Sequence, residues 1–197
     1  YRMLIAVAGV VLYAGITQRS LILSFPQIGK AMAVGLVIAL HWVFFYLSIK
    51  SATVSIAVVC LSFATFFSAL IEPLFFKRKI YPYELIFGIL VVIGLIYIFN
   101  FQPGYSEGIF YGVISASLSA LFTVLNGKLA PKFEAVALST YELLGGFLGI
   151  SMYFFLSSKL SPELFHVSTS DLFYLILLGI VCTAFAFVAS VLVMKQL

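Results

Sequence analysis

The sequence predicts an all-α integral membrane protein, a helical bundle, and three observations lead to that fold class. Of its 197 residues, 63% are hydrophobic and 9% are charged, and the mean hydropathy is +1.20. Soluble domains carry about 25% charged residues. The apolar residues also form runs long enough to cross a bilayer, and such runs must be helical because lipid offers no partner for an open strand edge. Finally, lysines and arginines gather at the ends of these runs instead of forming one basic face, which argues against nucleic-acid binding.

A window of about 19 residues gives seven expected spans. They cover residues 1–16, 31–49, 53–76, 83–100, 108–126, 136–157 and 171–194. The prolines fall between spans or in a terminal turn, where a missing backbone N–H is tolerated. The link 17–30 is partly apolar and is expected to lie along the membrane interface, whereas the link 158–170 is the most polar.

The second and third spans are joined by only three or four residues, which predicts a tight antiparallel hairpin. His41 lies near the middle of the second span, and the third span carries several serines and threonines. Glu72 comes near the end of the third span and is expected to pair with Lys77 or Arg78 at the interface. Because polar groups at membrane depth are costly and are usually kept for function, we expect this hairpin to line a translocation path.

Lysines and arginines are divided unequally between the two sides of the expected bundle. One side carries eight of them: Arg19, Lys30, Lys77, Arg78, Lys79, Lys128, Lys132 and Lys195. The other side carries three: Arg2, Lys50 and Lys159. The positive-inside rule places the side with eight in the cytoplasm, so the first span is expected to begin outside the cell and the seventh to end inside it.

Small residues spaced by four form ridges on two spans, which predicts close approach of neighbouring helices. These ridges consist of Gly108, Gly112, Ala116 and Ala120 on the fifth span and of Gly145 and Gly149 on the sixth.

An internal repeat with a period of five helices is also predicted. Displacing the sixth span by 140 positions aligns Tyr13 with Tyr153, and displacing the seventh by 145 aligns Lys50 with Lys195. An odd period means that the two copies cross the membrane in opposite senses. The repeats are expected to cover residues 1–101, lacking a first helix, and 102–197, lacking the last two.

The order of these features resembles a known family. The run HWVFFYLSIKSATVSIAVVCLSFATFFSALIEPLFFKRKI, followed by ELIFGILVVIGLIYI, is similar to the drug/metabolite transporter superfamily in its EamA-type branch. Gly88 and Gly94 match a glycine pair typical of that branch, and GIFYGVISASLSALFTVLNGKLA resembles the opening helix of its second half. Where the family usually has Gly-Glu after its fourth helix, this chain has Lys77-Arg78-Lys79, so a role of that glutamate does not carry over.

The resemblance implies a ten-helix transporter made of two inverted five-helix halves, of which this chain would hold helices two to eight. It implies a secondary-active carrier for a small organic metabolite such as an amino acid, which works by alternating access and often exports its substrate. A bacterial inner membrane is then the expected location, the lipid bilayer and the substrate are the expected partners, and protons are a candidate coupling ion. No cofactor and no nucleic acid is expected.

Five residues are predicted to bind substrate. His41, Phe45 and Ser48 follow one another at one-turn and two-turn spacing, so one helix face offers a titratable ring, an aromatic wall and a hydroxyl. Trp42 extends the aromatic wall, and Glu142 places an ionisable group within the sixth span. The alternative interpretation is that His41 is hydrogen-bonded in a helix interface and that Glu142 reaches towards the membrane surface.

Other function classes have weaker support. No H-E-x-x-H, paired cysteine ligands or G-x-S-x-G turn occurs, which argues against an enzyme. Cys60 and Cys182 are expected to be buried thiols that act as small hydrophobes. A complete seven-helix receptor or photoreceptor-like protein is the main alternative, although the seventh span carries no mid-helix lysine for a retinal Schiff base. A channel would require a ring of like charges or a carbonyl filter, and neither is evident.

Overall fold

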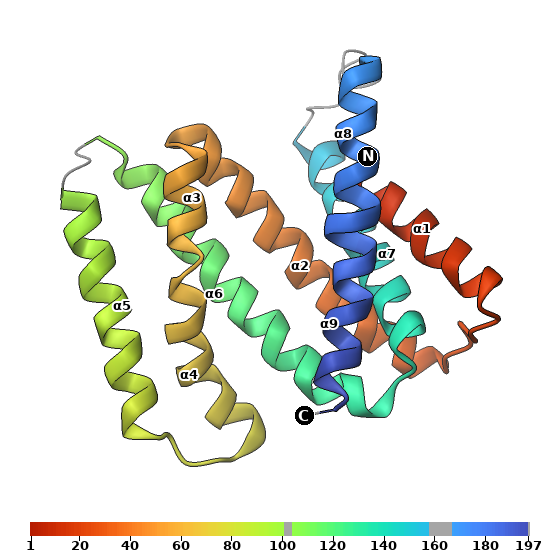
Figure 1. Cartoon of the computed structure of the whole chain (residues 1–197), viewed down its shortest axis with the longest axis horizontal. Helices are drawn as coiled ribbons and strands as arrows, with labels where there is room; N and C mark the ends of the chain where they lie inside the picture. Colours follow the sequence, from red (N-terminus) through yellow and green to blue (C-terminus); the bar gives the residue numbers. More distant parts are fainter. Residues whose placement is uncertain (101–103, 158–166, 197) are drawn as a thin grey trace. The chain divides into compact units, whose positions relative to one another are not determined.

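The structure, a computed structural model, describes residues 1–100, 104–157 and 167–196, and every expected span is helical (Figure 1). The first five helices are α1 (Arg2–Ile16), α2 (Phe25–Ser51), α3 (Val54–Cys60), α4 (Phe63–Phe76) and α5 (Pro82–Asn100). They are followed by α6 (Ser106–Leu129), the 3-10 turn η1 (Ala130–Lys132) and α7 (Ala135–Leu156). The last span consists of α8 (Thr169–Gly179), the π-helical turn η3 (Ile180–Phe185) and α9 (Ala186–Met194).

The all-α membrane class is confirmed. No strand occurs in the described part of the chain, and five helical segments are long and apolar enough to cross a membrane. The two other apolar helices, α1 and the Pro82–Tyr97 part of α5, are shorter. The expected repeat boundary at residue 101, together with Lys159 of the cation count, lies outside the described residues.

The second span begins at Phe25, so the expected start at residue 31 is wrong. The Ser24 N–H and hydroxyl both donate to Gln27 Oε1, each at 2.9 Å, while the Ser24 carbonyl accepts from the Gln27 and Ile28 N–H groups. The Gln27 side chain thus reaches back to the Ser24 N–H, which is one half of an S-x-x-Q capping box, and a proline in the first helical turn is compatible with it because no helical donor is lost there. The local capping signal therefore lengthens α2 to 27 residues.

The third span is interrupted after Cys60. The N–H groups of Leu61, Ser62 and Ala64 each donate to a carbonyl only three residues earlier, at 2.9 to 3.1 Å. Such tight 3-10 bonding is common at helix ends and can mark a hinge within a helix.

The turn between α2 and α3 is as short as expected, and the two helices form a hairpin (Figure 1). Thr53 caps α3, because its hydroxyl oxygen accepts a hydrogen bond from the Ile56 N–H at 3.2 Å.

The chain forms two compact units, and each is described by itself. Unit 1 consists of residues 1–39 and 129–197, and unit 2 of residues 40–128. In unit 1, α1 packs on α7 and on the last span, and in unit 2, α4 packs on α5. This division by contacts differs from the division by sequence repeat, which stays a prediction.

Glycines allow two helices of unit 1 to touch through their backbones. A Cβ added to Gly35 of α2 would collide with the Glu142 carbonyl oxygen of α7 and would lie 2.8 Å from Gly146 N. On the α7 side, a Cβ on Gly145 would lie 2.6 Å from the Met32 carbonyl oxygen. The crossing of α2 and α7 therefore depends on glycine on both helices.

The predicted ridge on the fifth span is confirmed as a packing surface of unit 2. A Cβ on Gly108 would collide with Ala52, and one on Gly112 would lie 2.6 Å from Cys60 Cβ. Farther along α6, Ala116 and Ala120 are buried. The small residues thus let α6 approach the α2–α3 hairpin closely.

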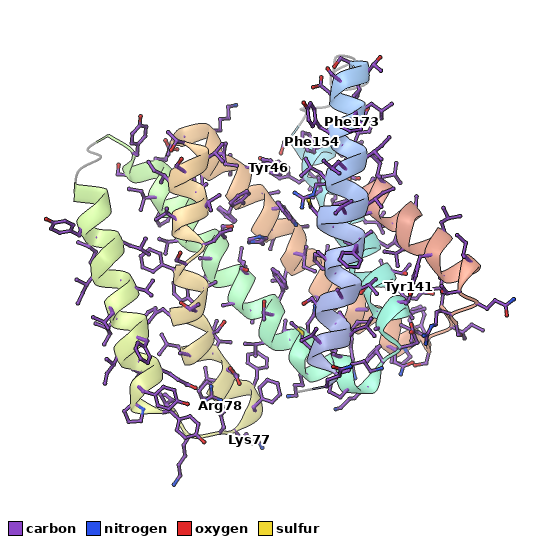
Figure 2. The ribbon with its side chains drawn as sticks, viewed as in Figure 1. Tyr46, Lys77, Arg78, Tyr141, Phe154 and Phe173 are labelled. Carbon is purple, nitrogen blue, oxygen red and sulfur yellow. The ribbon has the colours of Figure 1, made fainter. Side chains whose placement is uncertain are left out.

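Arg78 organises the basic turn that joins α4 to α5 (Figure 2). Its Nε lies 3.2 Å from Glu72 Oε1, and its Nη1 lies 3.0 Å from Glu84 Oε2. The expected pairing of Glu72 with a cation of this turn is therefore confirmed, with Arg78 as the partner. Hydrogen bonds to Glu72 and then to Glu84 raise the pKa of Arg78 above its ordinary value.

The orientation of the chain stays a prediction that cysteine labelling can test. In a variant with Cys60 and Cys182 replaced, a cysteine at Ile80, which is exposed beside Lys79, is expected to react only with membrane-permeant thiol reagents in intact cells. A cysteine at Ser168, the exposed N-cap of α8, is expected to react with impermeant reagents as well. The reverse labelling pattern would contradict a cytoplasmic location of the basic turn.

Candidate functional site

His41 links α2 to α6 through a reciprocal pair of hydrogen bonds in unit 2. Its Nδ1 lies 2.9 Å from the Ser115 carbonyl oxygen and 2.9 Å from Ser115 Oγ, and the Ser115 hydroxyl donates to the His41 carbonyl at 3.1 Å. Because a carbonyl oxygen can only accept, Nδ1 must carry a hydrogen and donate it. His41 is 6% exposed and Ser115 is fully buried, so this His41–Ser115 pair joins two spans away from solvent.

Three aromatic rings surround the imidazole. The Trp42 ring centroid lies 5.4 Å from that of His41 in an edge-on arrangement, and Phe45 stacks at 6.2 Å. Phe122 of α6 adds a third edge-on ring at 5.6 Å. Such edge-on and offset contacts are the favoured geometries of aromatic pairs. The structure thus brings together His41, Trp42 and Phe45, as the sequence predicted.

Sequence analysis missed two partners, Ser115 and Phe122. Both lie on α6, seven residues apart, and therefore on one helix face. The signal that points to Ser115 is its position beside Ala116 on the small-residue ridge, since the ridge faces the hairpin that carries His41.

Ser48 contacts the same neighbouring helix. It is fully buried, and its hydroxyl donates to the Gly108 carbonyl at 2.7 Å. Its position seven residues after His41 accounts for this, because both side chains face α6. Its hydroxyl thus bonds two spans together, which is a common role for serine in membrane helices.

Glu142 belongs to unit 1, so it is described separately from the other four residues. Its side chain is fully buried in α7, beside the buried residues Ser139 and Thr140. The Thr140 hydroxyl donates to the Val136 carbonyl at 2.7 Å. A buried ionisable group within a span is costly, which favours a function for Glu142.

Within residues 1–100, 104–157 and 167–196, no group of three or more His, Cys, Asp or Glu side chains could hold a metal ion.

The two cysteines differ in their burial. Cys60 is buried against α6, as expected, whereas Cys182 is exposed, so its expected burial is wrong. Cys182 lies in η3, next to the buried Thr183.

Comparison with known proteins supports the resemblance noted in the sequence. The model of the EamA-like transporter family matches residues 1–100, which include the His41 region and the basic turn. Searches of curated proteins and of solved structures gave no match. A match to a family of transporters favours a carrier over a receptor or an enzyme. The chain spans a membrane several times, and it belongs to the EamA-like transporter family.

Proposed function

We propose that the protein is a secondary-active transporter that exports a small organic metabolite, such as an amino acid, across the inner membrane of a bacterium. Membership of the family supports transport in general. The finer proposal is carried by one observation: a buried histidine with a fixed hydrogen-bond geometry lies sixteen residues into a membrane-spanning helix, among aromatic rings. Alternating access of two inverted halves would expose such a site to each side of the membrane in turn.

Each proposed site residue has a distinct role. His41 binds a polar group of the substrate, and Trp42 and Phe45 supply an aromatic surface for its apolar part. Ser48 helps to hold this surface in place through its bond to the Gly108 carbonyl. Glu142 carries the coupling proton, because a carboxyl group buried within a span can exist in two protonation states as access to water changes.

Transport by purified protein in lipid vesicles tests this proposal, with a panel of radiolabelled amino acids as the probe. His41→Asn keeps a donor at the position of Nδ1 but removes the imidazole, and it is expected to lose both exchange and uphill transport. Glu142→Gln is expected to retain exchange of labelled substrate while losing movement driven by a pH gradient, because an amide cannot carry the proton.

Tyr46→Phe is the matched control. Tyr46 directly follows Phe45 but is 51% exposed, so its change is expected to leave transport unaltered. The sole tryptophan, Trp42, lies beside His41 and gives a fluorescence readout of substrate binding that does not depend on transport. Parental rates with parental pH dependence in both site variants would show that His41 and Glu142 only pack the fold.

A further inference from the structure

The basic turn that joins α4 to α5 holds three consecutive cations, and the protein itself neutralises the middle one. Arg78, next to Lys77 in this turn (Figure 2), forms ion pairs with Glu72 Oε1 at 3.2 Å and with Glu84 Oε2 at 3.0 Å. Lys77 and Lys79 are exposed, and within the described part of the chain neither ammonium group has a carboxylate or hydrogen-bond partner. Two positive charges of this turn are therefore available to a partner outside the chain.

Lys128 of α6 already supplies a cation to the end of α4. Its Nζ lies 3.5 Å from the Phe75 carbonyl oxygen and 5.8 Å from the centroid of the Phe75 ring. A cation at a helix C-terminus interacts favourably with the helix dipole and with the terminal carbonyl groups. Lys77 and Lys79 are therefore not needed for that common role.

Lys77 adopts a backbone conformation that lysine rarely adopts. It is the C-cap of α4 and has φ 53° and ψ 32°, in the left-handed region. Glycine is the usual residue in such a position because it has no Cβ to be strained. A lysine makes this helix end less stable than glycine would, and that cost favours a binding role for its side chain.

Two tyrosines follow the lysines and extend the basic turn with an aromatic surface. The rings of Tyr81 and Tyr83 stack with their centroids 5.6 Å apart, and both residues are exposed. The guanidinium carbon of Arg78 lies 5.6 Å from the Tyr81 ring centroid, which holds the aromatic pair beside the turn. Exposed tyrosines are typical of the level at which lipid headgroups meet water.

The lengths of the neighbouring helices place the turn at that level. The preceding span, Val54–Phe76, has 23 residues. At 1.5 Å per residue it is about 35 Å long, slightly more than a hydrocarbon core of about 30 Å. The next apolar helix begins at Pro82. Residues 77–81 therefore connect two apolar helices just outside the hydrocarbon core, where the phosphates of phospholipids lie.

We propose that the basic turn binds the headgroup of an anionic phospholipid, with its phosphate held by the ammonium groups of Lys77 and Lys79. Free phosphate shares the anionic chemistry but has no apolar part. Leu74, Phe76 and Ile80 beside the lysines are exposed, so this surface offers hydrocarbon contacts that an acyl chain makes and inorganic phosphate does not. The lipid is therefore the occupant, and its site is independent of the proposed transport site.

Native mass spectrometry of the full chain in micelles of a neutral detergent tests the proposal, because it counts the lipids bound to each molecule. The probes are dioleoyl-phosphatidylglycerol and dioleoyl-phosphatidylcholine, which has the same acyl chains and a zwitterionic head. Each lysine at a membrane surface raises the affinity for anionic lipid about fivefold, so phosphatidylglycerol is expected to bind at least tenfold more tightly. Inorganic phosphate is expected not to displace it.

A double variant removes both available charges. Lys77→Gln combined with Lys79→Gln is expected to lower the affinity for phosphatidylglycerol roughly 25-fold and to leave that for phosphatidylcholine unchanged. Arg19→Gln combined with Lys30→Gln is the matched control, because both residues are exposed, lie outside the turn and remove the same net charge. This control is expected to bind phosphatidylglycerol as the parent does.

Lys77→Gly separates lipid binding from folding. It is expected to lower the affinity for phosphatidylglycerol about fivefold, while the thermal unfolding midpoint stays the same or rises because glycine relieves the left-handed conformation. Equal binding of the two lipids, displacement of phosphatidylglycerol by inorganic phosphate, or an equal loss of affinity in the Arg19 and Lys30 control would overturn the proposal.

Discussion

Gly35→Ala is expected to destabilise the protein strongly. The added Cβ would meet the Glu142 carbonyl oxygen, Gly146 N and Gly145 Cα, and all three are backbone atoms that no rotamer change can move. Overpacking of a core costs about 1–3 kcal/mol when side chains can adjust, so we expect a loss of about 3 kcal/mol or more where they cannot. Fluorescence-detected gel filtration and the thermal unfolding midpoint in detergent would measure this loss.

Gly15→Ala is the matched control. Gly15 also lies in a helix of unit 1, but nothing lies within 4 Å of an added Cβ. Alanine favours helix over glycine by about 0.8–1 kcal/mol, so this variant is expected to be as stable as the parent or slightly more stable. A Gly35→Ala protein with the unfolding midpoint of the Gly15→Ala protein would mean that α2 and α7 are not in backbone contact.

His41→Ala is expected to lower the free energy of unfolding by about 2–3 kcal/mol. The change leaves a cavity among Trp42, Phe45 and Phe122, and it removes the bond from Nδ1 to the Ser115 carbonyl. Interhelical hydrogen bonds in membranes contribute only about 0.6 kcal/mol on average, so the cavity dominates. Unfolding by increasing denaturant, followed through Trp42 fluorescence, would measure the change.

His41→Asn distinguishes the hydrogen bond from the ring. The asparagine amide nitrogen takes the place of Nδ1 and can donate to the Ser115 carbonyl, so we expect this variant to be more stable than His41→Ala while still lacking the titratable imidazole. Equal destabilisation by alanine and asparagine would show that the His41–Ser115 pair contributes nothing to stability.

The helical class and the places of the apolar segments could be predicted because they depend on composition and length alone. Runs of about 20 apolar residues must be helices in lipid, and α2, α6 and α7 follow from that requirement. The packing role of Gly108 and Gly112 was equally readable, since a ridge of small residues has few other uses in a membrane. At the candidate site, the spacing within α2 was enough to group His41 with Phe45.

Hydrogen bonds between residues that are far apart in the sequence could not be predicted from composition and length. Ser115 is separated from His41 by 74 positions, and Arg2 from Thr183 by 181. Hydropathy places Arg2 at the start of the first span, as the structure does, but a one-dimensional pattern contains no information on which part of another span lies beside it. The wrong start of α2 has a different cause, because the bond from the Ser24 N–H to the Gln27 side chain is a local signal that a hydropathy window averages away.

The π-helical turn has a consequence for the phase of the last span. A π turn inserts one residue into the α-helical repeat, and each residue advances the helix by about 100°. The side chains of α9 therefore face directions about 100° away from those that an uninterrupted continuation of α8 would give. The inward positions Thr183, Val188 and Val191 are spaced by five and then by three. A helical-wheel projection with 3.6 residues per turn, drawn over the whole span, therefore cannot give the buried faces of both halves correctly. Because the turn holds one extra residue, deleting one residue from η3 would restore a regular helix and leave Val191, which is buried with Leu138 of α7, facing its present contact.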